Sequence, residues 1–208
     1  MVVKRAKDKT HYIVDINGNP IHYPSVSKIL SAAFPSPFNP RNPGNKKDRK
    51  KCLQRGIAVH EAIQNNLQNK PLHIPLANAA YYYAALGEIE KIEEIGLIEE
   101  SVYHNTHQYA GTLDLIAKMD GEWALVDWKS TRKPRKASQM QRDFHQAAAY
   151  VGAVNWLYGW QIRKAKIICL LPSEESQVWE IEGDRLDSYW KRFQKAAREY
   201  HRVKALVR

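Results

Sequence analysis

The chain has 208 residues, a mass of 24.0 kDa and a formal net charge of +10 at pH 7, with an isoelectric point near 9.5. Hydrophobic residues make up 44% of it, which excludes a wholly disordered chain, and no apolar run approaches the length that spans a membrane. Its two cysteines, Cys52 and Cys169, are too few for a disulfide framework or a four-cysteine iron–sulfur cluster. We therefore expect one α/β domain over residues 1–208, without such a cluster, and the basic charge balance favours a polyanionic partner.

The first ten residues are basic and contain no apolar signal core. Strand-like residues begin by Tyr12, whereas a transit peptide would be a longer, acid-poor amphipathic segment. The sequence therefore predicts a cytoplasmic protein, either bacterial or made by a phage in the cytoplasm of its host.

A hairpin and a short helix are predicted next. Asn17-Gly18 is a strong turn signal between two strands, His11–Ile16 and Pro20–Tyr23. Ser25 then has the side chain and position to cap a helix that ends near Ala33.

Two longer helices follow a proline-rich loop. The first carries through to about Gln68 and contains His60, and by pattern alone a lone histidine on an apolar helix face is more often a core residue than a ligand. The second is predicted from about Asn78 to Ile95, with its isoleucines on one stripe, and Gly96 is expected to end it. Leu97–Tyr103 is then predicted as a strand that pairs with the segment Gly111–Thr131.

The segment Gly111–Thr131 is predicted to form a β-hairpin, because two apolar runs flank Asp120-Gly121, a favoured two-residue turn. With that turn, Asp114 lies directly opposite Asp127, and their β-carbons are roughly 4.5–5.5 Å apart. Strand alternation puts Lys129 on the same face as Asp127. Two carboxylates and an amine are thus expected to project together from one hairpin.

These three polar side chains stand in strands that are otherwise largely apolar, which indicates a sheet covered on both faces. Two carboxylates so close would force one of them to stay protonated, whereas a divalent cation resolves the conflict. Hard oxygen ligands suit Mg²⁺ or Mn²⁺, and Lys129 beside the cation would orient or deprotonate an attacking water or stabilise charge on a phosphate. An Asp127–Lys129 ion pair on a solvent-facing strand is the alternative that the pattern leaves open.

Here the sequence resembles a known family. Gly111-Thr-Leu-Asp114 and Val126-Asp-Trp-Lys129 resemble the core of the PD-(D/E)XK nuclease superfamily, although no proline precedes Asp114. Gly56-Ile-Ala-Val-His60 upstream and Gln146-Ala-Ala-Ala-Tyr150 downstream are similar to elements of its RecB-like branch, and the likeness covers about residues 20–200. Three shorter segments resemble one subgroup, the mitochondrial genome maintenance exonucleases and their phage relatives: Tyr23–Leu30, Glu100–His104 and Lys133-Pro134.

The resemblance implies a restriction-endonuclease-like core with a mixed central β-sheet flanked by helices. It also extends the metal site, because the histidine that matches His60 lies at the cation in RecB-like nucleases. Glu100 matches an acidic position near the cation. The Trp128 backbone carbonyl is implied to complete the ligand shell together with Asp114 and Asp127.

Gln146 and Tyr150 are four residues apart in a helix predicted over Phe144–Tyr158, so they share one helix face. By resemblance this face lines the active site, with Gln146 near the metal and Tyr150 near DNA. The residues expected to act in catalysis are therefore Asp114, Asp127, Lys129, Gln146 and Tyr150.

Four cations stand in five residues shortly after the catalytic lysine, and a track for phosphates is the function we expect for them. Two hydroxyl side chains before them would add contacts. The predicted nucleic-acid contacts are Ser130, Thr131, Arg132, Lys133, Arg135 and Lys136.

Two strands, Gln161–Leu171 and Gln177–Glu182, and a structural amphipathic helix through Tyr200 are predicted to complete the chain.

The expected function is a metal-dependent exonuclease that hydrolyses phosphodiester bonds of DNA, and the resemblance implies a preference for single-stranded ends. We expect a monomer that serves DNA recombination, repair or replication, working with a recombination or replication protein and not with a membrane. Two alternatives stay open. A structure-specific endonuclease would use the same residues, and a non-catalytic DNA-binding protein would retain only the nuclease fold.

Overall fold

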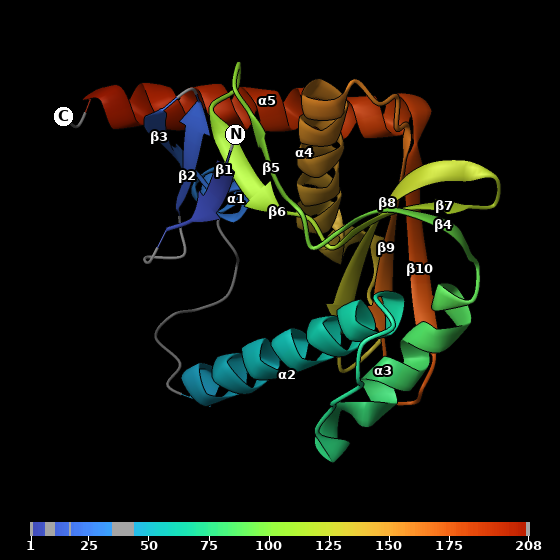
Figure 1. Cartoon of the computed structure of the whole chain (residues 1–208). Coiled ribbons are helices and arrows are strands. Elements are labelled where there is room, and N and C mark those ends of the chain that lie inside the picture. The colour runs from blue at the N-terminus through green and yellow to red at the C-terminus, as the bar shows by residue number, and fades with distance from the viewer. Residues whose placement is uncertain (1, 7–10, 17, 35–43, 207–208) are drawn as a thin grey trace.

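A computed structural model describes residues 2–6, 11–16, 18–34 and 44–206 of the chain. A five-stranded sheet lies at the centre of the fold (Figure 1). One neighbouring pair of its strands is parallel and the other three pairs are antiparallel, so the predicted mixed sheet is confirmed. In spatial order the strands are β10 (Ser176–Glu182), β9 (Lys164–Leu170), β8 (Glu122–Ser130), β7 (Leu115–Met119) and β4 (Ile92–Ile98).

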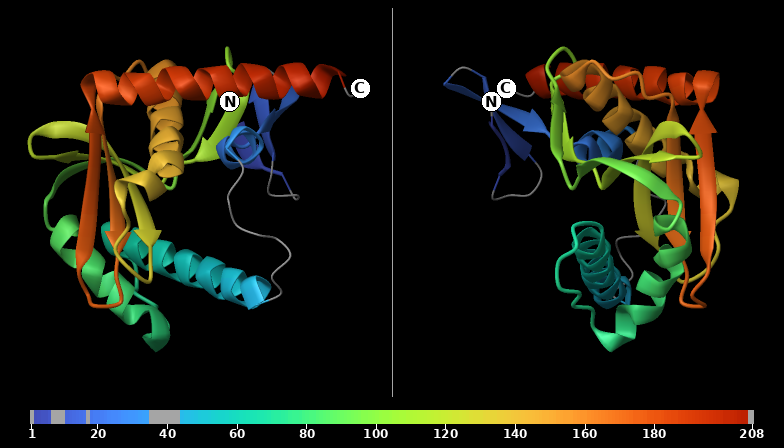
Figure 2. Two further views of the ribbon diagram at one scale, coloured as in Figure 1. Left: turned by 180° about the vertical axis from the view of Figure 1, so that it is seen from behind. Right: turned by 45° about the vertical axis from the view of Figure 1, so that its right-hand side comes forward.

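Helices cover both faces of this sheet, as two further views show (Figure 2). They are α2 (Gly44–Leu67) and α3 (Leu76–Ile89) on one face, and α4 (Gln141–Tyr158) and α5 (Gly183–Leu206) on the other. Because successive strand residues point to opposite faces, Leu125 packs in the apolar cluster under α4 while its neighbour Val126 packs under α2 and α3. Within the described ranges, no helix combines the length and the apolar character that crossing a bilayer requires.

The predicted catalytic hairpin is formed by β7 and β8, and its register is the expected one. Leu115 pairs with Val126, and the turn residues Asp120 and Gly121 have φ angles of +54° and +76°, as a tight hairpin turn requires. Asp114 directly precedes β7, and the same register continued by one residue sets it opposite Asp127.

The predicted helix from Asn78 to Ile95 is confirmed through Ile89 and is wrong beyond it. α3 ends at Ile89, and the chain then forms β4, which pairs with β7 at the edge of the sheet. Two register shifts in β4 are irregularities of the kind that a bulge introduces, and they break the alternation that marks a strand in a sequence. A helix was predicted here from the spacing of the isoleucines, and the pairing of β4 with β7 outweighs that local pattern.

Gly96 does not end a helix but lies inside β4. A Cβ atom there would stand 2.8 Å from the ring of Trp160 and 3.0 Å from the ring of Trp123. Glycine therefore lets two indole rings pack closely over the strand.

The predicted strand Leu97–Tyr103 is interrupted at Glu99, whose φ of +48° lies in the left-handed region. The chain leaves the central sheet there and continues as β5 (Ser101–His104), which pairs with β6 (Tyr109–Thr112). This β5–β6 hairpin leads directly from Glu99 to Asp114.

The N-terminal hairpin and the helix after it are confirmed, with Ser25 Oγ accepting a hydrogen bond from the Lys28 backbone N–H at 3.1 Å. An additional strand pairs with the hairpin and makes a three-stranded sheet, which packs on the β5–β6 hairpin through Tyr12, Tyr23 and Tyr103. These elements are β1 (Val2–Arg5), β2 (His11–Ile16), β3 (Asn19–Pro24) and α1 (Val26–Ala33).

Candidate active site

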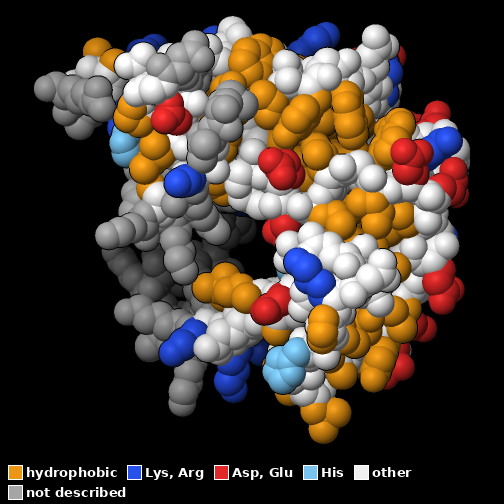
Figure 3. Space-filling view, viewed as in Figure 1, with side chains coloured by type: hydrophobic (Ala, Val, Ile, Leu, Met, Phe, Trp, Pro, Cys, Tyr) orange, Lys and Arg blue, Asp and Glu red, His pale blue; other side chains and the backbone are white. Residues whose placement is uncertain are grey.

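A cavity of about 710 Å³ opens between α2, the N-terminal elements and the catalytic hairpin. Figure 3 shows the molecule hollowed above α2. Segments far apart in the sequence line this cavity, and they bring together six charged or polar side chains: His60, Glu99, Asp114, Lys129, Gln146 and Tyr150. Five of these six residues were predicted from the sequence to act at one site.

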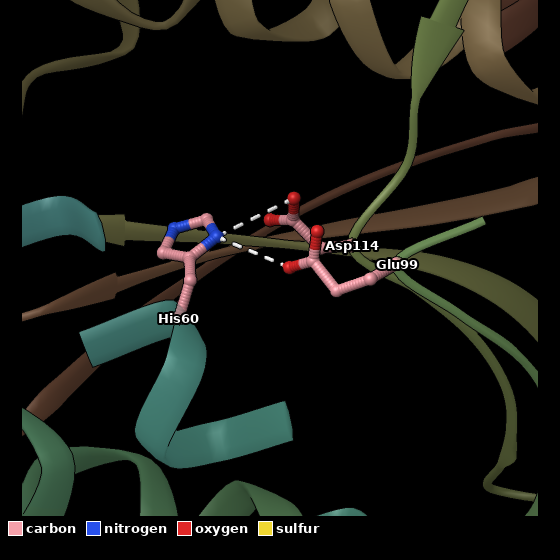
Figure 4. Close-up of side chains that lie close together, drawn as sticks. All are labelled: His60, Glu99 and Asp114. Carbon is pink, nitrogen blue, oxygen red and sulfur yellow. Dashed lines mark ion pairs between the residues drawn. The ribbon is translucent and has the colours of Figure 1, made fainter. Parts of the chain in front are cut away.

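Three side chains in the cavity form a candidate metal site, which we call the carboxylate cluster: His60, Glu99 and Asp114. His60 Nδ1 lies 3.5 Å from Asp114 Oδ1 and 3.7 Å from Glu99 Oε1 (Figure 4). One ligand atom from each residue lies within 4.8 Å of the others. Among the described residues, Asp127 does not belong to the group whose ligand atoms meet this limit.

The orientation of the His60 ring is fixed by the backbone. Its Nε2 lies 2.8 Å from the carbonyl oxygen of Trp128, and because a carbonyl can only accept, Nε2 carries a proton and donates. The other nitrogen, Nδ1, is thereby presented to the two carboxylates. A backbone carbonyl is the usual outer partner of a metal-binding histidine. The Trp128 carbonyl was expected to bind the cation. In the structure it instead accepts a hydrogen bond from His60.

Electrostatics in the cluster favour a positive charge at its centre. Burial alone would lower the pKa of His60, but the charge and hydrogen bonding of Asp114, with the help of Glu99, raise this pKa to about 10. Burial would raise the pKa of Asp114, but His60, Lys129 and the Trp128 N–H, which donates to Asp114 Oδ2 at 2.8 Å, hold it below its usual value. A proton on His60 or a bound metal cation would each supply the positive charge that the two carboxylates favour.

The structure brings Glu99, not Glu100, to the cluster. The left-handed backbone at Glu99 directs its carboxylate toward His60. The neighbouring Glu100 is exposed, and its charge contributes to the raised pKa of Tyr158. Sequence reasoning missed Glu99 because strand alternation carried through the segment gives no sign of the break. Left-handed backbone at a non-glycine residue is uncommon, and such residues cluster at functional sites.

A second group of residues adjoins the cluster, and we call it the lysine chain: Asp127, Lys129, Gln146 and Tyr150. Lys129 Nζ lies 2.5 Å from Asp127 Oδ2 and donates to Gln146 Oε1 at 3.4 Å. Gln146 Nε2 in turn donates to the Tyr150 hydroxyl at 3.3 Å. The Asp127–Lys129 ion pair that the sequence left open therefore forms, but Asp127 is only 2% exposed, so the strand is buried and does not face solvent.

The pKa values of Asp127 and Lys129 in the lysine chain are both shifted. Burial raises the pKa of Asp127 to about 7, against the opposing effect of Lys129, and the nearby carboxylates Asp114 and Asp143 add to the rise. Burial would lower the pKa of Lys129, but Asp127, Asp143 and Asp114 raise it above its usual value. Asp127 Oδ2 is buried, and its close contact among the described residues is with the Lys129 ammonium.

Gly111, the first residue of the Gly-Thr-Leu-Asp motif, is required by a close contact. A Cβ atom on Gly111 would lie 2.6 Å from Cε1 of Tyr150. The glycine therefore lets the Tyr150 ring lie against the backbone that leads into Asp114.

The loop after the catalytic lysine divides into inward and outward side chains. Arg55 donates two hydrogen bonds to Ser130. Its Nε donates to the Ser130 hydroxyl at 3.1 Å, and its Nη2 donates to the Ser130 carbonyl at 3.0 Å. Thr131 is buried, and Arg135 pairs with Asp143 at 2.7 Å. The predicted contacts that remain exposed are Arg132, Lys133 and Lys136.

The residues of the site fit a hard divalent cation. The cluster offers two carboxylates and one imidazole, whose ligand atoms all lie within 4.8 Å of one another. Oxygen-rich donor sets of this kind suit Mg²⁺ or Mn²⁺ better than a soft metal.

Comparison with known proteins agrees with this chemistry. The sequence profile of the PD-(D/E)XK nuclease superfamily matches residues 88–199, which is more than half of the chain and includes the hairpin, the lysine chain and Glu99. The chain belongs to the PD-(D/E)XK nuclease superfamily. Nucleases of this superfamily use divalent metals, and the carboxylate cluster is a group of residues that could hold one.

Individual relatives carry similar names. Human mitochondrial genome maintenance exonuclease 1 is 25% identical over 153 residues, which cover 70% of this chain and 44% of that protein. The mouse protein of the same name is 28% identical over 116 residues, 54% of this chain and 34% of its own length. The chain thus matches less than half the length of these relatives. A solved structure from Eubacterium rectale, assigned as an exonuclease, has 16% identity and a TM-score of 0.49, and the match covers 74% of this chain and 67% of that one.

Proposed function

We propose that this nuclease is a Mg²⁺- or Mn²⁺-dependent exonuclease that hydrolyses phosphodiester bonds at the ends of DNA and prefers single strands. The observation that carries the proposal is the meeting of the carboxylate cluster and the lysine chain in one cavity. Bound cations and positively charged donors both stabilise the charge that develops when a phosphodiester is hydrolysed.

The cation would be held by Asp114, Glu99 and His60, with Asp127 beside them. When bound, it supplies Lewis acidity, which polarises a phosphoryl oxygen and lowers the pKa of water. His60 keeps its orientation through the Trp128 carbonyl.

Lys129 acts on the phosphate or on the attacking water through its ammonium group. An ammonium has three N–H donors, and contacts with Asp127 and Gln146 occupy two of them among the described residues. The third is available to the cavity. Gln146 holds this geometry, because its amide oxygen accepts from Lys129 while its amide nitrogen is fixed by Tyr150.

DNA is the proposed polyanion. The net charge of +10 and the exposed Arg132, Lys133 and Lys136 beside the site support contact with the phosphate backbone. The names of the relatives support exonuclease action. We propose that the protein serves DNA recombination, repair or replication as a monomer that works with a recombination or replication protein.

The test uses single strands labelled at the 5′ or the 3′ end, together with a closed circular single strand, in Mg²⁺, Mn²⁺ or EDTA. We expect degradation of the linear strands only, loss of activity in EDTA and in a Lys129→Ala variant, and full activity in a Lys191→Ala control, which changes an exposed lysine of α5 away from the cavity. Cutting of the circle would instead show an endonuclease. Binding without cleavage in either metal would refute catalysis and leave a DNA-binding protein.

A further inference from the structure

Helix α2 carries two apolar stripes instead of one. Val59, Ala62 and Ile63 are buried in the core between α2, α3 and the sheet. On another side of the helix, Leu53 and Ile57 are 65% and 58% exposed, and both line the catalytic cavity. A surface helix normally places polar residues on the side turned away from the core. Packing among the described residues therefore does not explain this second stripe.

The position between these two residues is also unusual. Gly56 lines the same cavity, and a Cβ atom built on it meets no atom within 4 Å. Glycine weakens the interior of a helix relative to alanine, and here no contact within the described chain requires it. A glycine that faces a cavity in this way leaves room for something that approaches the helix backbone closely.

The remaining walls of the cavity are polar. Glu99, Asp114 and Lys129 lie on the sheet side, and hydroxyl groups of Tyr12, Ser25, Ser27 and Thr112 line the N-terminal side. Helix α2 itself adds the polar side chains His60, Glu61 and Gln64 beside Leu53 and Ile57. Hydrophobic side chains are also visible at the edge of the hollow over α2 in Figure 3. A ligand that fills this cavity must present charged and hydrogen-bonding groups to most of the lining and an apolar surface to Leu53 and Ile57.

We propose that Leu53, Gly56 and Ile57 form a wall that binds an unpaired nucleobase of the substrate strand. The inference rests on the proposed function, since the phosphate of the same nucleotide would lie at the cation and Lys129. The flat face of a base packs on an aliphatic surface, while the sugar and phosphate take the hydroxyl groups opposite. In a duplex the base faces are stacked inside the helix and cannot reach such a wall. The wall therefore selects unpaired nucleotides.

The test measures binding in EDTA, where no cleavage occurs, by the fluorescence anisotropy of a labelled single-stranded oligodeoxynucleotide. A second oligomer has the same length but abasic sugars in place of its nucleotides. The variant is Leu53→Gln with Ile57→Gln, which keeps good helix formers at two exposed positions. The matched control is Leu76→Gln, which changes a leucine that is 92% exposed and does not line the cavity.

We expect the double variant to bind the base-bearing strand about tenfold more weakly than the wild type, because apolar contact with the base is lost. Its affinity for the abasic strand should be unchanged, and the control should behave as the wild type on both. Equal weakening on both strands would show that α2 contacts the backbone, and unchanged binding of the base-bearing strand would show no contact; either result overturns the proposal.

The same measurement separates this inference from the proposed function. If the wild type cleaves nothing but the double variant still loses base-dependent binding, the wall is supported and the catalytic proposal fails. If the wild type cleaves single strands and the double variant binds them normally, the catalytic proposal stands and the wall is refuted.

Discussion

The carboxylate cluster and the lysine chain lie side by side, but the protein completes them to different degrees. In the lysine chain, Asp127 is buried and each side chain contacts the next, from the carboxylate to the Tyr150 hydroxyl. In the carboxylate cluster, His60 Nδ1 stands 3.5 and 3.7 Å from its partners, too far for good hydrogen bonds, and all three side chains are partly open to the cavity. The Asp127–Lys129 contact at 2.5 Å is thus already made, whereas His60 Nδ1 stays 3.5 Å or more from both carboxylates of the cluster.

The two groups also differ in what holds them. Asp127 and Lys129 lie two residues apart on one strand, and Gln146 and Tyr150 lie on one face of α4. The cluster joins α2, the break after β4 and the segment before β7. We therefore expect changes in the lysine chain to act on activity, and changes around the cluster to act on cation affinity and on the stability of the connecting segments.

The largest effect is expected from Lys129→Ala. Loss of a positioned donor at a developing charge commonly lowers kcat by about 10²–10³-fold, while the cluster keeps its ligands. Single-turnover cleavage should show this loss, and titration calorimetry with Mn²⁺ should show nearly unchanged affinity. A large loss of Mn²⁺ affinity would break the distinction between the two groups.

Glu99→Gln should lower Mn²⁺ affinity by at least about tenfold, because even groups outside the ligand set of a metal commonly contribute that much. The matched control is Glu100→Gln, which makes the same chemical change at the exposed neighbour and should leave the affinity unchanged. Calorimetry on the two variants checks this directly. A larger loss of Mn²⁺ affinity in Glu100→Gln than in Glu99→Gln would support Glu100 as the ligand, as predicted from the sequence.

Two glycines of the site should respond in opposite directions. Gly111→Ala places a methyl group 2.6 Å from the Tyr150 ring, so the free energy of unfolding should fall by about 1–3 kcal/mol. Gly56→Ala meets nothing within 4 Å and removes a helix-weakening residue, so it should raise that free energy by up to about 1 kcal/mol. Urea denaturation of both variants measures the difference, and a loss of stability in Gly56→Ala would reveal a contact that the cavity does not show.

The smallest effect concerns the β5–β6 hairpin, which connects Glu99 to Asp114. His104, at the end of β5, packs against Trp156 and Trp190, and burial lowers its pKa to about 4, with a contribution from the nearby His107. The unfolded chain binds this proton near pH 6.5, so the stability due to neutral His104 is complete above that pH and is lost as the pH falls toward about 4.

We expect this loss to reach about 1 kcal/mol by about pH 5.5, after allowing for solvent screening of a partly buried ring. Urea denaturation at several pH values checks it against His104→Gln, which should be less stable at pH 7 but should lose less stability on acidification. Parallel pH profiles for the two proteins would contradict a role of His104 in the acid response.

The sequence by itself predicted the centre of the site because its geometry is local. The turn at Asp120-Gly121 sets the register, the register sets Asp114 against Asp127, and alternation adds Lys129. Gln146 and Tyr150 follow from helical spacing once the resemblance indicates which face matters. Each of these relations spans one strand pair or one helical turn, and the structure shows all of them.

Only the tertiary structure decided the rest. His60 was expected at the site by resemblance and not by its pattern, and it lies there because α2 packs beside β8, where a backbone carbonyl orients its ring. Glu99 replaced Glu100 because the strand breaks at a left-handed residue, and Ser130, Thr131 and Arg135 turned inward because α2 and α4 offer them partners or cover. Local patterns determine which face a side chain takes within an element. Contacts between elements decide whether that face meets the cavity, and those contacts depend on packing that the order of residues does not display.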